Sequence, residues 1–365
     1  MFSPSEFRAL VSGQRRGLGA ALLRWALRFA ETPYVLAVRW RNHRYDRGAV
    51  KVERVTVPVV NVGNLTLGGT GKTPMVEWLI RWLCQRGLRT GIVSRGYGAV
   101  AGEVNDEALE LQQRLPDVPH VQDPNRVEAA RQAIAQFGCQ VIVLDDAFQH
   151  RRIARDVDIV LLDALEPFGF DHVFPRGTLR EPVSGLRRAD VVVLSRSGML
   201  AKEDRAAIRR RVARLAPNAL WVEADHRPLA LCGASGQQRS IEVFAEKAVA
   251  AFCGVGNPAG FRHTLRLCGY RVIAFREFAD HYRYARADVE SLISWAEGLD
   301  VEAVLCTHKD LVKLRLDQLG GRPLWAVAIG MDLLVGQAGL ESKLARLLPG
   351  GKESGGTGAI DLRRG

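Results

Sequence analysis

Paired cysteines are missing from this sequence. Six cysteines are scattered over 365 residues, and no two of them form a C-x-x-C pair. This spacing argues against a zinc site and against a disulfide framework, and it favours a reducing cytoplasm. We also expect no secretory signal, because the N-terminus lacks an apolar core followed by a small-residue cleavage site.

A long uninterrupted apolar run is also missing. A spanning helix needs roughly 18 such residues, whereas the apolar stretch at residues 17–47 is broken by Arg24 and Arg28. Its aliphatic and aromatic residues stand among many arginines. This composition predicts an amphipathic helix whose apolar side chains enter a lipid surface while the arginines meet anionic headgroups. A helix that packs on the protein's own core is the alternative.

Low-complexity sequence and an acidic balance are absent as well. Hydrophobic residues make up 47% and charged residues 25%, which excludes disorder or a collagen-like chain for most of the protein. Lys and Arg number 51 against 40 Asp and Glu, so the net charge is +11. This charge favours an anionic partner: nucleic acid, a membrane surface or a phosphorylated substrate. A genomic preference for arginine would be the neutral explanation.

Continuous apolar segments alternate with helical ones from residue 55 onward. We predict strands at 55–63, 89–94, 139–146, 156–163 and 189–195, and short strands near 220, 249, 270, 302 and 324. Helices are predicted at 73–87, 106–115, 126–138, 202–217, 258–267 and 286–299. This alternation predicts an α/β fold whose parallel sheet is covered by helices on both faces. Residues 234–239 are a candidate linker between two α/β parts.

The strongest local motif is a glycine-rich turn between a predicted strand and a predicted helix. It consists of Gly68, Gly69, Thr70, Gly71, Lys72 and Thr73. Glycines let backbone N–H groups turn toward phosphate oxygens, the lysine reaches the terminal phosphates, and the threonine hydroxyl can hold Mg²⁺. Thr66 stands where the strict G-x-x-x-x-G-K-[ST] pattern begins with glycine. The strand and helix on either side nevertheless favour a phosphate loop over a structural turn.

A pair of acids ends the apolar run at 139–146. Asp145 and Asp146 are expected at the carboxyl end of a central strand, facing the phosphate loop, where either acid can hold Mg²⁺. Solvated acids that merely end a strand are the alternative. Together the two motifs predict a P-loop protein that hydrolyses nucleotides or transfers phosphoryl groups.

Other P-loop classes fit less well. Membrane-cycling ATPases carry a lysine just before the paired glycines, where this chain has Leu67. The GTPase pattern N-K-x-D is absent, since Lys309 and Asp310 are adjacent. The H-R-D and D-F-G stations of protein kinases do not occur. A small-molecule or lipid kinase remains, and a nucleotide-dependent membrane switch is the rival from another class.

A larger set of motifs follows in a fixed order. It comprises GNLTLGGTGKTP (63–74), SRGYG (94–98), NDEA (105–108), DDAFQHRR (145–152), RGTLREP (176–182) and DHYRY (280–284). Over about residues 10–345 this combination resembles the tetraacyldisaccharide 4′-kinase (lipid A 4′-kinase) family. The resemblance implies that ATP and Mg²⁺ are used to phosphorylate the 4′-hydroxyl of a tetraacylated glucosamine disaccharide 1-phosphate. It implies action at the cytoplasmic face of the inner membrane, on a glycolipid in an anionic lipid surface, with no nucleic-acid or protein partner.

The resemblance also implies roles for single residues. Lys72 and Thr73 would contact phosphate and Mg²⁺, and Asp145 and Asp146 would be the acids on the metal side. Asp106 resembles the general base for the sugar hydroxyl, and His281 resembles the partner that orients it. Arg180 would offset charge on the transferring phosphate, and Gln149 would be a further polar group of the site. From the residues alone, Asp106 could be a helix cap and Arg180 a structural partner of Glu181.

The chain departs from the family pattern at three places. Ala147 stands where glycine is frequent, Arg176-Gly177-Thr178 where Ala-Gly-Pro is common, and His308 where glutamate is usual. None of these lies in the phosphate loop, the acid pair or the DHY element. We expect four parts: a membrane-associated segment (1–50), a P-loop kinase domain (51–233), a smaller C-terminal α/β domain (240–348) and a disordered tail (349–365).

Overall fold

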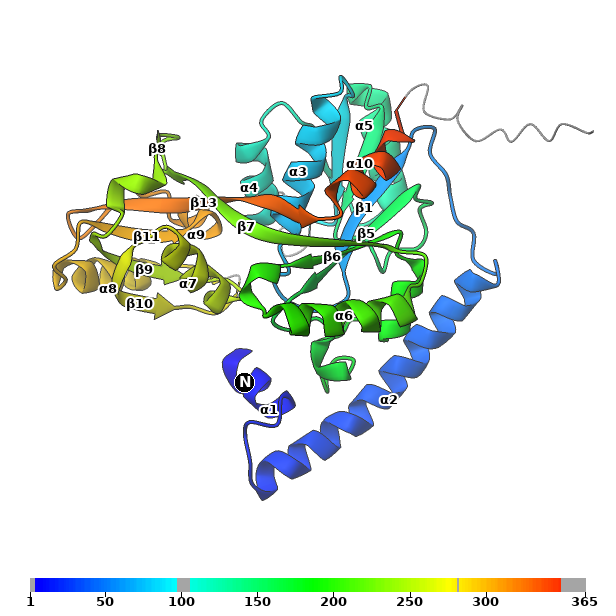
Figure 1. Ribbon diagram of the computed structural model, residues 1–365, viewed down its shortest axis with the longest axis horizontal. Coiled ribbons are helices and arrows are strands. Elements are labelled where there is room, and N and C mark those ends of the chain that lie inside the picture. Colours follow the sequence, from blue (N-terminus) through cyan, green and yellow to red (C-terminus); the bar gives the residue numbers. More distant parts are fainter. Residues whose placement is uncertain (1–3, 97–105, 281, 349–365) are drawn as a thin grey trace, which may run out of the picture.

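The computed structural model describes residues 4–96, 106–280 and 282–348. A mostly parallel sheet forms its centre, with strand order β10-β9-β11-β13-β7-β6-β5-β1-β4-β2-β3 and helices on both faces (Figure 1). The strands on this path are β1 (Val59–Asn64), β2 (Thr90–Ser94), β3 (His120–Gln122), β4 (Val141–Asp145), β5 (Val157–Asp163), β6 (Val191–Ser195), β7 (Leu220–Cys232), β9 (Ala248–Cys253), β10 (Arg271–Glu277), β11 (Ala303–Thr307) and β13 (Arg322–Val335).

Ten α-helices are described, and most of them follow the predicted segments. They are α1 (Pro4–Val11), α2 (Leu18–Asp46), α3 (Lys72–Cys84), α4 (Asp106–Arg114), α5 (Arg126–Phe137), α6 (Lys202–Leu215), α7 (Pro258–Leu267), α8 (Arg286–Glu297), α9 (His308–Leu314) and α10 (Gln337–Ala345). The short helices α1, α9 and α10 are additions to the sequence prediction.

The strands around β1 are buried on both faces. All six residues of β1 are buried, and β1 pairs in parallel with β4 on one side and β5 on the other. Val60 and Val62 pack with α3, whereas Val59 packs with α5. This two-sided burial explains the continuous apolar runs in the sequence and confirms the predicted α/β fold. It also fixes the carboxyl ends of β1 and β4 side by side.

One part of the sheet differs from the predicted parallel arrangement. The two longest strands, β7 and β13, run antiparallel and pair from Ala326 with Cys232 to Val335 with Glu223. About 90 residues separate them in the chain, so no local pattern reveals their pairing. The expected linker at 234–239 contains a short strand, β8 (Gln238–Arg239), that folds back onto β7. A second short strand, β12 (Gln318–Leu319), pairs with β13. The boundaries proposed at 233 and 240 stay a prediction.

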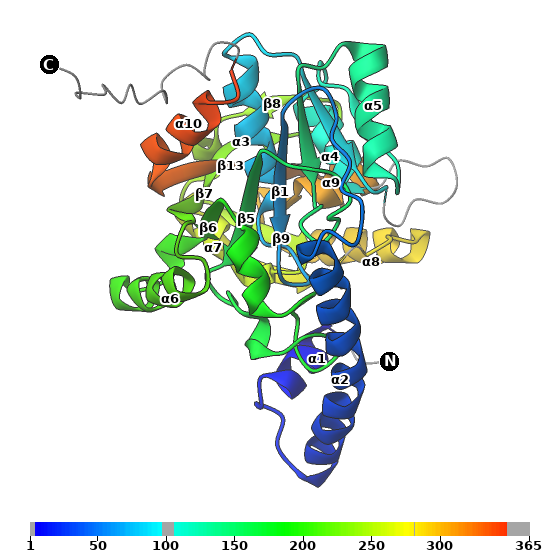
Figure 2. The same ribbon diagram turned by 90° about the vertical axis from the view of Figure 1, so that its right-hand side faces the viewer.

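The N-terminal helix α2 projects away from the sheet (Figures 1 and 2). Ala20 and Val38 are its buried residues. Its large apolar side chains face outward, with Trp25 62% and Phe29 63% exposed. The predicted amphipathic helix is confirmed, and the alternative of burial against the protein core is wrong for most of its length. Among the described residues, no helix is both long and apolar enough to cross a bilayer.

Candidate functional site

The phosphate loop, residues 65–71, joins the carboxyl end of β1 to the start of α3. Gly68 and Gly71 adopt φ angles of 103° and 85°, a left-handed region that favours glycine. A Cβ built on Gly71 would also lie 2.5 Å from Nε2 of the buried His226. The sequence therefore needs glycine at both positions to bring the loop backbone to the helix N-terminus, where anions bind.

Side chains from the end of β6 hold this loop. Ser195 Oγ donates to the carbonyl of Thr70 at 2.8 Å, and an Arg196 Nη donates to the carbonyl of Gly69 at 3.0 Å. Arg196 also pairs with Asp163 at 2.6 Å. Ser195 and Arg196 were not expected at the site from the sequence. Their place at the carboxyl end of a predicted strand was the available signal.

The acid pair lies beside the loop, as predicted. Asp145 is the buried last residue of β4 and pairs with Val62 of β1. Asp146 has a positive φ of 55°. Lys72 Nζ lies 3.7 Å from its Oδ1. The lysine of the phosphate loop and the second acid of the predicted pair therefore face each other.

Arg180 joins the same carboxylate. One of its Nη atoms donates to both oxygens of Asp146, at 2.8 Å each. The segment before it pairs with the loop, because Leu67 N donates to the Thr178 carbonyl at 2.7 Å. The alternative pairing of Arg180 with Glu181 is wrong, since the buried Glu181 instead accepts from Arg188 at 2.7 Å.

Gln149 makes two hydrogen bonds next to the phosphate loop. Its Nε2 donates to the carbonyl of Asn64 at 2.9 Å and to Oε1 of Glu181 at 3.2 Å. Asn42 of α2 donates to the other oxygen of Glu181 at 3.0 Å. Gln149 thus ties the end of β1 to the loop that carries Arg180, and helix α2 is connected to the same point.

The proposed base and its partner fall at the edge of what the structure describes. Asp106 is the first residue of α4, but its side chain and all of His281 lie outside the described residues. The preceding residue, Asp280, is described. A Cβ built on Gly256 would lie 2.7 Å from Asp280 Oδ2 and 3.1 Å from Gly69 N. The DHYRY element of the C-terminal part therefore reaches the phosphate loop.

The residues after His281 are anchored to α9. Tyr284 donates its hydroxyl to the buried Asp310 at 2.9 Å, and Lys313 Nζ donates to the Tyr282 carbonyl at 3.1 Å. Thr307 caps α9 and donates to Asp310 at 2.6 Å. Burial raises the pKa of Asp310, while these hydrogen bonds oppose that shift. This network fixes the DHYRY element relative to β9 and β11.

Further cations surround the acids. Arg126 at the start of α5 is 3% exposed. Burial lowers the pKa of its guanidinium, and the negative charges of Asp145 and Asp146 oppose that shift. Burial lowers the pKa of His150 to about 4, and Arg126 and neighbouring arginines add to that shift. His150 is therefore neutral at pH 7. Arg126 was not expected at the site, because nothing in its local sequence separates it from other helical arginines.

The donor set at the loop suits Mg²⁺. The Thr73 hydroxyl follows the loop, and the Asp145 and Asp146 carboxylates end the adjacent strand. These are hard oxygen donors, and Mg²⁺ commonly uses only one or two protein carboxylates together with substrate phosphates. The described residues hold no cluster of three or more His, Cys, Asp or Glu that could bind a metal ion.

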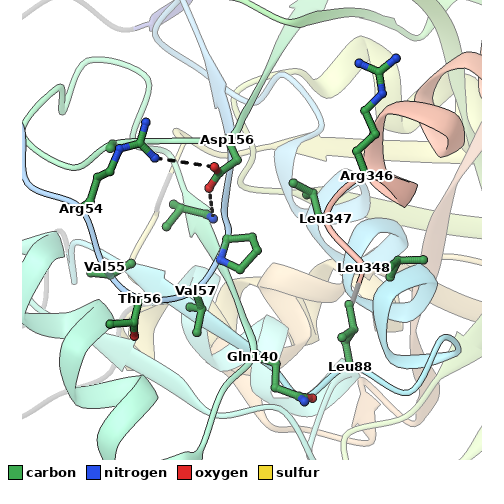
Figure 3. Close-up of a pocket in the computed structure, with 13 residues that line it drawn as sticks. Arg54, Val55, Thr56, Val57, Leu88, Gln140, Asp156, Arg346, Leu347 and Leu348 are labelled. Carbon is green, nitrogen blue, oxygen red and sulfur yellow. Dashed lines mark hydrogen bonds and ion pairs between the residues drawn. The ribbon is translucent and has the colours of Figure 1, made fainter. Parts of the chain in front are cut away.

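A separate pocket lies at the opposite edge of the sheet. It has a volume of about 440 Å³ and is lined by residues 54–58 before β1, by Gln140 and Asp156 before β4 and β5, and by residues 346–348 (Figure 3). Asp156 accepts from Val59 N at 2.8 Å there. The pocket is at the amino ends of the strands, so it is not part of the phosphate-loop site.

Comparison with known proteins agrees with this geometry. The family model Tetraacyldisaccharide-1-P 4′-kinase matches residues 23–349. A tetraacyldisaccharide 4′-kinase of Anaeromyxobacter dehalogenans is 40% identical over 360 residues, covering 93% of this chain and 95% of its own length. This chain belongs to the tetraacyldisaccharide 4′-kinase family. The kinase of Chlorobaculum parvum is 37% identical, covering 88% of this chain and 94% of its own.

A solved structure extends the comparison. The crystal structure of LpxK from Aquifex aeolicus in complex with ATP matches with a TM-score of 0.69 and 28% identity, covering 90% of this chain and 100% of that one. This chain performs the ATP-dependent phosphorylation of tetraacyldisaccharide 1-phosphate at the 4′ position in lipid A biosynthesis (EC 2.7.1.130). The family and the activity expected from the sequence are confirmed.

Proposed function

We propose that the site around the phosphate loop carries out this transfer with Asp106 as general base. The observation that carries the proposal is the contact of Asp280 with Gly256 and the close approach of Gly256 to Gly69 N, which bring the DHYRY element to the loop. His281 is the next residue in the sequence, and its proposed role is to orient the base. A nucleotide switch that transfers phosphate to water has no need of such a hydroxyl-side pair.

The chemical step follows from these roles. The 4′-oxygen of the sugar forms a bond to the γ-phosphorus, and the bond from that phosphorus to the β–γ bridging oxygen breaks. The hydroxyl proton passes to the Asp106 carboxylate, and ADP leaves. Positioning and charge neutralisation dominate phosphoryl transfer. Lys72 and Arg180, held together at Asp146, supply positive charge to the transferring group.

Mg²⁺ is proposed as the cofactor held by Thr73, Asp145 and Asp146. When bound, it neutralises charge on the β- and γ-phosphate oxygens. The loop amides of Gly68, Gly69, Thr70 and Gly71 would bind the phosphates directly.

The membrane surface is proposed as the place of action. The outward apolar side chains of α2 lie among arginines, as in helices that bind anionic bilayer interfaces. Asn42, near the end of the same helix, donates to Glu181, which in turn accepts from Gln149. The docking helix is therefore joined to the loop that carries Arg180, so the acylated substrate and the site would be presented together.

The decisive experiment is transfer of radiolabelled γ-phosphate from Mg-ATP to detergent-dispersed tetraacyldisaccharide 1-phosphate. Asp106→Asn should lower label in the lipid by about 10²-fold or more, while Asp117→Asn, an exposed turn residue, should not. Equal label in wild type and Asp106→Asn would refute the base. Label released only as free phosphate, whatever the lipid, would instead support the membrane switch.

A further inference from the structure

Helix α1 brings an arginine to the phosphate loop. The Arg8 guanidinium lies 3.6 Å, at one Nη, from the position that a Cβ on Gly68 would occupy. Gly68 is the fourth loop residue after β1 and has a φ of 103°. Helix α1 precedes residue 23, where the match to the family model begins, so Arg8 lies outside the residues that this model matches.

The helix is seated firmly enough to hold that position. Leu10 is 1% exposed, and the ring of Phe7 packs against that of Phe174 with centroids 6.3 Å apart. Phe174 belongs to the segment that leads to Arg180. Backbone hydrogen bonds from Ser12 N to Arg8 and from Arg15 N to Ala9 close the helix end. The packing of Phe7 before Arg8 and of Leu10 after it therefore holds this part of the helix in place.

The guanidinium has capacity left for a ligand. Its Nε lies 3.8 Å from Glu166 Oε2, beyond hydrogen-bond distance, and its side chain is 40% exposed. Glu166 accepts instead from the Thr178 hydroxyl. Among the residues that the structure describes, no hydrogen bond joins the Arg8 guanidinium to protein. Five N–H donors in a planar fork are thus available at the mouth of a phosphate-binding loop.

We propose that Arg8 is an arginine finger supplied by the chain's own N-terminal helix. It contacts the terminal phosphate of ATP and stabilises the negative charge that develops during transfer to the sugar hydroxyl. Phosphoryl-transfer sites use such an arginine because its fork matches phosphate oxygens. Arg8 approaches from the Gly68 side of the loop, whereas Arg180 and Lys72 are held on the side of Asp146.

The same placement links catalysis to the docking helix. A short turn joins α1 to α2, and Arg24 of α2 donates to the carbonyl of Arg15 at 2.8 Å. Figure 2 shows α1 lying beside α2, below the carboxyl edge of the sheet. Movement of α2 at a lipid surface would therefore change the position of Arg8 at the loop. This inference rests on the proposed function of the phosphate-loop site. It adds Arg8 to the transfer step, while ATP binding does not depend on this residue.

The test measures kcat and KM separately for full-length Arg8→Ala and Arg8→Lys, with Mg-ATP and detergent-dispersed tetraacyldisaccharide 1-phosphate. Arg8→Ala should lower kcat by about 10²-fold and change the KM for ATP by less than about threefold. Arg8→Lys should recover part of the rate, because it keeps the charge but not the fork. Low millimolar guanidinium chloride should raise the rate of Arg8→Ala several-fold and leave the wild type unchanged.

Two controls separate this role from a structural one. Glu166→Gln removes the charge facing Arg8, and Arg209→Ala removes an exposed arginine of α6; both should stay within about threefold of wild-type kcat. A Glu166→Gln variant as slow as Arg8→Ala, or an Arg8→Ala variant within threefold of wild type, would overturn the proposal. If Asp106→Asn is inactive while Arg8→Ala is not, the proposed site stands and the finger alone is refuted.

Discussion

Arg180 and Asp146 are bound to each other through both carboxylate oxygens, at 2.8 Å each, and Lys72 faces the same carboxylate at 3.7 Å. The chain thus uses one acid to hold two cations beside the phosphate loop. Thr178, two residues before Arg180, accepts a hydrogen bond from the loop amide of Leu67. The position of the arginine is therefore set by backbone pairing as well as by charge.

Removing either partner should impair the chemical step. Asp146→Asn and Arg180→Ala should each lower kcat by about 10²–10³-fold, since each disturbs charge aimed at the transferring group. The double variant should be little worse than either single one, because the two residues act as a unit. Initial rates of lipid phosphorylation measure this.

A matched control lies in the segment that leads to Arg180. Arg176→Ala removes an arginine that pairs with Glu31 at 3.3 Å, away from Asp146. It should leave kcat within about threefold of the wild type, because the pair is partly exposed and contributes little. Fully additive losses in Asp146→Asn/Arg180→Ala would contradict the coupled arrangement.

The local elements of this site could be predicted from the sequence because their signals are local. The apolar run of β1, the glycines after it and the lysine-threonine pair lie within 15 consecutive residues, and backbone geometry alone dictates glycine at 68 and 71. Asp145 and Asp146 followed from the rule that parallel strands end at one edge.

Contacts between distant segments could not be predicted. Ser195 and Arg196 hold the loop through tertiary packing, and the partner of Arg180 proved to be Asp146 instead of its neighbour Glu181. The antiparallel pairing of β7 with β13 joins segments about 90 residues apart. Helix α1 is 8 residues long, too short for its periodicity to identify it.

A buried ion network should be critical for stability. Arg114 of α4 pairs with Glu77 of α3 at 2.9 Å and with Glu110 at 2.9 Å, and all three side chains are less than a tenth exposed. Arg114→Ala leaves the buried Glu110 without its cation and leaves Glu77 with only the half-exposed Arg81. The loss should cost about 3–5 kcal/mol in the free energy of unfolding. Urea denaturation measures this.

Arg131 supplies the comparison. It also pairs with two carboxylates, Glu53 at 2.9 Å and Glu128 at 2.7 Å, but its side chain is 48% exposed. Arg131→Ala should cost far less than Arg114→Ala in the free energy of unfolding, because water screens exposed pairs. Similar losses in the two variants would show that burial does not determine the contribution of these networks.

Histidine burial should give the stability a defined pH dependence. Burial lowers the pKa of His120 from 6.5 to about 4, and its Nε2 lies 2.8 Å from Ser94 Oγ. Below pH 6.5 the unfolded chain therefore binds a proton that the folded chain does not, so stability falls as the pH drops toward 4. His120→Gln should reduce this slope by up to about 1.4 kcal/mol per pH unit.

The measurement is urea denaturation of both proteins at pH 7, 6 and 5. His150, whose pKa is also lowered to about 4, contributes equally to both, so a shallower slope rather than a flat line is expected. Parallel curves for wild type and His120→Gln would mean that His120 keeps its ordinary pKa in the folded protein.

The outward face of α2 should determine binding to anionic membranes. Trp25 and Phe29 lie one turn apart with ring centroids 4.5 Å apart, and both are more than 60% exposed. Insertion of such side chains into a bilayer interface removes apolar area from water, at about 1.5–3 kcal/mol for each ring. Trp25→Ala/Phe29→Ala should therefore weaken binding to anionic vesicles at least about tenfold, as measured by sedimentation.

The control is Phe137→Ala, which removes an exposed ring on α5 (49%) and should bind like the wild type. The rate of phosphorylation of detergent-dispersed lipid should change little in the double variant and in Phe137→Ala, because these rings lie away from the phosphate loop. Unchanged vesicle binding in the double variant would assign the membrane contact to another face of the kinase.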